Sequence, residues 1–85
     1  MTTLDREILD FIGPGRIIQI HERTGVYIVG KFKLAASHIQ DWVRSGYVTE
    51  ELTSVEDTGQ GTLYPAVRLS LTPFGMRALA APVGL

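Results

Sequence analysis

The sequence contains no cysteine, so neither a disulfide framework nor a thiolate metal site can form. No run of apolar residues reaches the length that is needed to span a membrane. The first ten residues, MTTLDREILD, carry acids early and lack the basic-then-apolar pattern of a secretory signal. These absences lead us to expect a cytoplasmic protein that does not associate with membranes.

The chain also lacks the basic excess of a typical nucleic-acid binder, because its formal net charge is −1. The charges are unevenly distributed. Residues 1–46 hold six basic and five acidic side chains, whereas residues 47–85 hold two basic and four acidic ones. Any surface that contacts DNA must therefore come mainly from the first half of the chain.

The size of the chain and its apolar content of 45% predict a single domain over residues 1–85. An amphipathic helix is predicted from Leu4 to Ile12, with a threonine as its N-cap and Gly13-Pro14-Gly15 as its end. Its expected apolar face consists of Leu4, Ile8, Phe11 and Ile12.

The next segment, residues 16–30 with the sequence RIIQIHERTGVYIVG, is compatible with three structures. The first is a helix that ends at Thr24 and is followed by an extended stretch. The second is a strand over residues 16–20 and then a short helix over His21–Val29. The third is a β-hairpin that turns at Arg23-Thr24-Gly25. We prefer the second, because it leaves only a short connection to the following helix.

A second amphipathic helix is predicted near residues 33–45, since apolar residues recur there at steps of three and four. Its inward face consists of Ala35, Ile39, Trp42 and Val43. Gly46 is expected to end the helix as a left-handed cap. Trp42 is expected to anchor the core and not to stack on a ligand.

From Tyr47 onward the apolar period changes to two, which predicts a long β-hairpin. The glycines between residues 57 and 61 permit the turn. Pro65 lies in the return strand and cannot donate a hydrogen bond, so we expect it at an edge position or a bulge. Thr72-Pro73 is a favourable start for a last helix, which Pro82 would end.

Two stretches of the chain are similar to parts of known DNA-binding domains. IQDWVRSGYV at residues 39–48 resembles the end of a recognition helix, and VRLSLTPFG at residues 67–75 resembles the joint before the final helix in MarR- and PadR-like regulators. The chain thus resembles the winged helix-turn-helix class of bacterial, archaeal and phage proteins over nearly its whole length. The resemblance implies an α+β fold with a three-helix core, a β-hairpin wing and a short C-terminal helix.

The resemblance also implies a transcriptional regulator that binds double-stranded DNA, as a homodimer, through the helix near residues 33–45. Basic side chains would contact phosphates, and polar side chains of the helix would reach base edges. The expected DNA-binding residues are Lys31, Lys33, Ser37, His38, Gln40 and Arg44, together with Gln60 at the tip of the wing.

The acidic side chains of the hairpin support an alternative function. Glu50, Glu51, Glu56 and Asp57 would repel a phosphate backbone, and they suit a winged-helix module that binds a basic protein partner.

The sequence points to no enzyme, cofactor or metal site. His21 and His38 have no partners at metal-ligand spacing. Ser37 and His38 are neighbours in a predicted helix and do not face each other, so they are not expected to form a catalytic pair.

Overall fold

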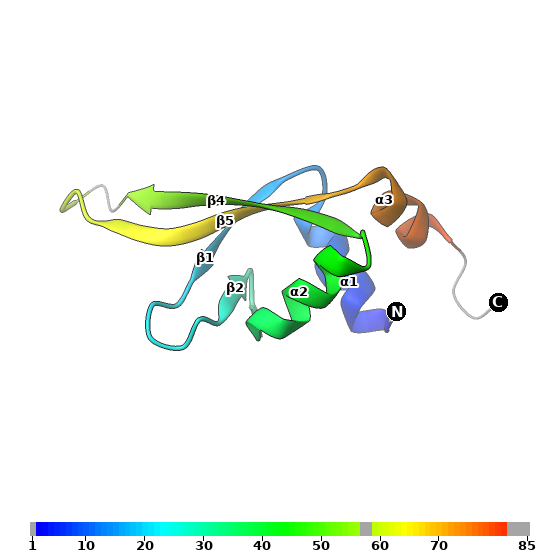
Figure 1. Cartoon of the computed structure of the whole chain (residues 1–85), viewed down its shortest axis with the longest axis horizontal. Coiled ribbons are helices and arrows are strands. Elements are labelled where there is room, and N and C mark those ends of the chain that lie inside the picture. Colours follow the sequence, from blue (N-terminus) through cyan, green and yellow to red (C-terminus); the bar gives the residue numbers. More distant parts are fainter. Residues whose placement is uncertain (1, 57–58, 82–85) are drawn as a thin grey trace.

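The computed structural model describes residues 2–56 and 59–81. Within these residues the chain forms three helices and five strands (Figure 1). In chain order they are α1 (Thr3–Ile12), β1 (Arg16–Ile20), β2 (Tyr27–Val29), β3 (Phe32–Leu34), α2 (Ala36–Arg44), β4 (Val48–Glu56), β5 (Leu63–Leu71) and α3 (Pro73–Ala80). All strands join one antiparallel sheet in the order β3-β2-β1-β5-β4.

This sheet corrects the expected winged helix-turn-helix fold. A three-helix core would need a helix between α1 and α2, but residues 27–34 form the short strands β2 and β3 instead. These strands extend the sheet of β1, β5 and β4, so the hairpin is not a separate wing but part of one five-stranded sheet. The predicted α+β class is correct, but the predicted arrangement of the helices and strands was wrong.

The segment at residues 16–30 is a β-hairpin, as in the third of the three structures considered. β1 pairs with β2 through Gln19↔Ile28 and Ile20↔Tyr27, so the preferred helix over His21–Val29 was wrong. Burial in β2 has a period of two, because Tyr27 and Val29 enter the core and Ile28 lies on the other face. Because β2 pairs with a strand on each side, its β-branched and aromatic residues are more favourable in a strand than in a short helix.

Helix α1 confirms the predicted amphipathic helix, but not all of its expected buried face. Thr2 and Asp5 form a capping box, in which the Asp5 N–H donates to Thr2 Oγ1 at 3.0 Å. Ile8, Leu9 and Ile12 are buried. Leu4 and Phe11, both expected in the core, are 49% and 37% exposed.

Helix α2 lies within the predicted range and buries Ile39 and Trp42, as expected. Val43 is half-buried and Ala35, the N-cap residue, is exposed. Gly46 has φ +83°, which confirms the left-handed end of the helix.

The β4–β5 hairpin is confirmed and pairs without a bulge from Val48↔Leu71 to Glu56↔Leu63. Pro65 lies just past Ala66, the last residue of β5 that pairs with β1. It therefore occupies the expected edge position, where β5 has a neighbour on one side only. Asp57 and Thr58 of the turn lie outside the described residues, as does Pro82.

Helix α3 begins as expected, with Thr72 as its N-cap and Pro73 in its first turn. The Thr72 hydroxyl accepts from Gly75 N–H at 2.9 Å and donates to the Gly46 carbonyl. Thr72 N–H donates to the Tyr47 carbonyl at 3.0 Å. One threonine thus joins the end of β5 to the turn between α2 and β4.

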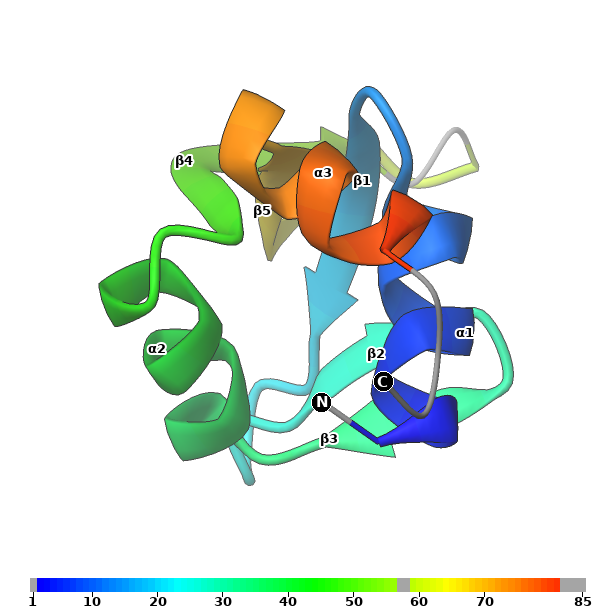
Figure 2. The ribbon, with the colours of Figure 1, turned by 90° about the vertical axis from the view of Figure 1, so that its right-hand side faces the viewer.

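The core lies between one face of the sheet and the three helices. Its buried apolar side chains are Ile8, Leu9, Ile12, Ile18, Tyr27, Val29, Leu34, Ile39, Trp42, Val48, Val67 and Leu69. The helices gather at one end of the molecule, and the hairpin extends away from them (Figures 1 and 2). Among the described residues, no helix is both long and apolar enough to cross a membrane.

Replacement of Gly75 by alanine is expected to destabilise the fold. A Cβ atom at this position would lie 2.1 Å from the Tyr47 carbonyl oxygen, so the α3 backbone would have to move. Urea denaturation should show a loss of about 2 kcal/mol in the free energy of unfolding. Helix propensity alone would give the opposite sign, a gain of up to about 1 kcal/mol, and a gain would contradict the close approach.

Replacement of Arg6 by alanine is expected to loosen the attachment of α3 to α1. The Arg6 guanidinium donates to the carbonyls of Ala78 at 3.2 Å and Ala81 at 2.8 Å, and to that of Leu79. Loss of these bonds at the helix C-terminus should lower the free energy of unfolding by about 1–2 kcal/mol. Arg77→Ala, on the exposed face of α3, is the control for charge, and an equal loss in both variants would contradict the capping role.

Candidate functional site

The expected DNA-binding residues do not all lie on one surface. Ser37, Gln40 and Arg44 are exposed on α2, and Lys33 is exposed on the neighbouring strand β3. The turn that contains Gln60 lies at the far end of the hairpin, away from α2 (Figure 1).

Most of the polar side chains around α2 already have acidic partners. Lys31 Nζ lies 3.7 Å from Glu7 Oε1, and Arg44 pairs with Asp41. Exposed pairs of this kind contribute little stability, but they place a carboxylate beside each cation. No ion pair involves Lys33 within the described part of the chain. The surface of α2 is therefore close to neutral.

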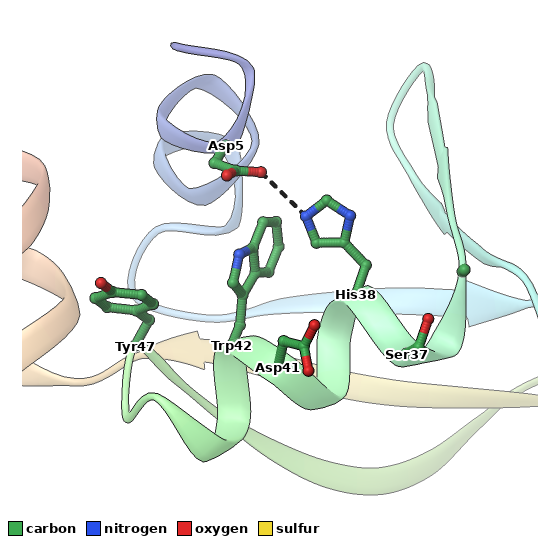
Figure 3. A pocket seen from close by; sticks show the side chains of 7 residues that line it. Asp5, Ser37, His38, Asp41, Trp42 and Tyr47 are labelled. Atoms are coloured by element: carbon green, nitrogen blue, oxygen red, sulfur yellow. Dashed lines mark hydrogen bonds and ion pairs between the residues drawn. The ribbon is translucent and has the colours of Figure 1, made fainter. Parts of the chain in front are cut away.

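His38 is turned toward α1, although 39% of its side chain remains exposed. Its Nε2 lies 3.0 Å from Asp5 Oδ1, and its ring meets the Trp42 ring edge-on at 4.8 Å between centroids (Figure 3). The Asp5 side chain is only 18% exposed. This pair joins the first helix to the second, so Nε2 of the imidazole already has a partner within the fold.

The electrostatics of Asp5 reflect two opposing effects. Burial raises the pKa of this carboxyl, but hydrogen bonds from the Thr2 backbone and from His38 outweigh burial. The net result is a pKa below the usual value of an aspartate. Local spacing could not reveal the His38 contact, because 33 residues separate the two positions.

An open cleft of about 470 Å³ lies beside this pair, between α1 and α2 (Figure 3). It is lined by Asp5, Ala35, Ser37, His38, Asp41, Trp42 and Tyr47. No hydrogen bond joins Ser37 to His38 in residues 2–56, so no nucleophile is held against the imidazole. Among the described residues no group of three or more metal-ligating side chains comes together.

Glu50 is half-buried on the core face of the sheet and does not belong to an acidic outer surface. The Tyr27 hydroxyl donates to Glu50 Oε2 at 2.5 Å, and Gln40 Nε2 donates to Glu50 Oε1 at 3.4 Å. Burial, followed by the Glu50 carboxylate, raises the pKa of Tyr27 to about 12. Two exposed acids remain on β4, Glu51 and Glu56, while Asp57 lies outside the described residues.

The far half of the hairpin exposes large apolar side chains. Leu52 lies directly opposite Val67, which lies opposite Ile18, so all three share the core face of the sheet. Ile18 and Val67 are buried, but Leu52 is 83% exposed and Leu63 is 62% exposed. We call the exposed end of this face the distal patch; it consists of Leu52, Ser54, Glu56, Leu63 and Pro65.

Sequence reasoning identified the apolar side of the hairpin but not its exposure. The alternation of Leu63, Val67 and Leu69 indicates a buried face, yet only the two nearer residues are buried. The missing information is where the helices stop. A strand continues its alternation whether or not another element covers it.

Asp5→Asn is expected to remove a pH-dependent contribution to stability. The pKa of Asp5 is lower in the folded state, so its contribution is present above the unfolded value near 4 and is lost as the pH falls through the folded value. The variant should lose about 1 kcal/mol at neutral pH, and the difference from the unmodified chain should shrink in strong acid. Urea denaturation across pH measures this, with Asp10→Asn on the same helix as the control. A difference that stays constant with pH would contradict the prediction.

Comparison with protein-family models, curated proteins and solved structures finds no match to this chain, and none of them identifies a winged helix domain.

Proposed function

We propose that this chain is a protein-binding module that docks its partner on the distal patch of the hairpin. The observation that supports this most strongly is the exposure of Leu52 and Leu63 on the face that elsewhere forms the core. Burial of two leucine side chains is worth roughly 3–5 kcal/mol, which is a substantial part of a binding free energy.

The charge around the patch favours a basic partner. Glu56 lies within the patch and Glu51 lies on the opposite face of the same strand, and both are exposed. An apolar surface that includes an acid is complementary to a segment that combines apolar and basic side chains.

The same charges make double-stranded DNA the weaker candidate. DNA binding draws most of its affinity from cations that neutralise phosphates. Lys31 and Arg44, two of the three cations expected to do so, have acidic neighbours, and His38 is bonded to Asp5. A protein partner needs none of these groups.

The proposal is tested by combining site-specific cross-linking with substitutions in the patch. A photo-reactive residue at position 63 should cross-link one reproducible protein from cells of the source organism, and the same residue at position 76 should not. Leu52→Ser with Leu63→Ser should reduce the capture of that protein at least about tenfold, equivalent to 1.4 kcal/mol. Met76→Ser is the matched control, since Met76 is an exposed apolar residue on α3.

Two results would overturn the proposal. One is undiminished capture of the cross-linked protein by the double-serine variant. The other is binding of labelled duplex DNA that is detected at low salt, weakens as salt is added and is reduced by Lys33→Ala. Such binding would place the function on the surface of β3 and α2.

A further inference from the structure

We propose that the outer edge of β4 accepts an extended, basic segment of the partner as a sixth strand of the sheet. This inference rests on the proposed function and specifies how the partner binds. β4 is the last strand in the order β3-β2-β1-β5-β4, so within residues 2–56 and 59–81 one of its two edges has no neighbouring strand. Addition of a strand to an exposed edge is a recurrent mode of peptide recognition.

The two edges of the sheet differ in how well they are protected. β3 is three residues long and carries Lys33, and both features discourage pairing with another chain. β4 is nine residues long, contains no lysine, arginine or proline, and pairs with β5 without a bulge. It therefore lacks the lysine, proline and bulge that blunt many long edge strands, and the charges that it does carry are all acidic.

The outer edge is open from Glu51 to Glu56. Helix α2 reaches β4 near its start, where Gln40 bonds to Glu50. Beyond that point the backbone hydrogen bonds of the described residues of β4 belong to its ladder with β5. Every residue from Glu51 to Ser54 is exposed, as is Glu56. Six residues give an accessible length of about 20 Å, which is an ordinary strand length.

The acids on this edge select the partner. A second copy of β4 would bring only acidic charges to this edge, because the charged residues of β4 are Glu50, Glu51 and Glu56, and like charges across strands are unfavourable. A basic strand would instead bring charges of opposite sign to these acids, which is favourable. Its side chains beside Leu52 and Ser54 would cover the distal patch and should be apolar, and those beside Glu51 and Glu56 should be basic.

The experiment is an NMR titration of the isotope-labelled full chain with the capped hexapeptide Lys-Thr-Val-Thr-Val-Arg. This peptide places valines beside Leu52 and Ser54 and cations beside Glu51 and Glu56 in an antiparallel arrangement. Amide shifts and slowed amide exchange are expected at residues 51–56. Two control peptides are used, one with glutamate in place of both cations and one with N-methylated backbone amides at alternate positions. Both should bind at least about tenfold more weakly.

A charge reversal in the chain provides a second, independent readout. Glu51→Lys with Glu56→Lys should invert the preference, so that the glutamate peptide binds more tightly than the basic one. Glu22→Lys, at an exposed position in the turn between β1 and β2, should leave the preference unchanged.

The outcomes separate this inference from the proposed function. Equal binding of the N-methylated peptide would overturn strand addition while leaving the distal patch as a docking surface. Equal binding of the glutamate peptide, shifts confined to α2, or the absence of binding would also overturn it. Loss of partner capture in the double-serine variant tests the proposed function by itself, whatever the peptides do.

Discussion

The fold depends on the burial of one face of the sheet at strand β5. This strand pairs with β1 on one side and β4 on the other, and its Val67 and Leu69 are fully buried. Side chains from α1 and α2 complete the same cluster; α1 contacts β5 itself, and α2 contacts the neighbouring strand β4. Thr72 then holds the end of β5 against the turn after α2, through bonds to the carbonyls of Gly46 and Tyr47.

A mismatch of lengths explains the exposed patch. The helices have eight to ten residues and are about 12–15 Å long, whereas strands of nine residues are about 30 Å long. Three short helices at one end cannot cover the whole of such a hairpin. The alternation of side chains nevertheless continues to the end of both strands, so Leu52 and Leu63 face water where Val67 faces the core. The apolar patch and the open edge of β4 thus have one geometric origin.

Among the described residues, several charged groups near the helices bond within the molecule, whereas Glu51 and Glu56 in the far part of β4 form no ion pair. His38 and Asp5 join the first two helices, Arg6 caps the last one, and Tyr27 holds Glu50 at the border of the core. Arg6 and His38 are thus already bonded within the fold, although a DNA-binding surface would need such groups. Glu51 and Glu56 have no such role among the contacts of the described residues; Glu56 shares a face with the exposed leucines, and Glu51 lies on the other face, opposite Arg68. The distribution is what one expects if recognition takes place on the hairpin.

Local features of the sequence were sufficient for the elements whose ends and faces are set by near neighbours. The capping box at Thr2, the glycine after α2 and the Thr72-Pro73 start of α3 each depend on residues only a few positions apart. The hairpin followed from its period of two. Residues 16–30 could not be decided in this way, because β2 is a strand only by virtue of its pairing with β1 and β3. The same holds for the candidate site: the pairing of Asp5 with His38, the inward turn of Glu50 and the exposure of Leu52 all depend on which elements meet in space. The sequence by itself determined the short-range geometry, and the tertiary structure alone decided which side chains are committed and which are free.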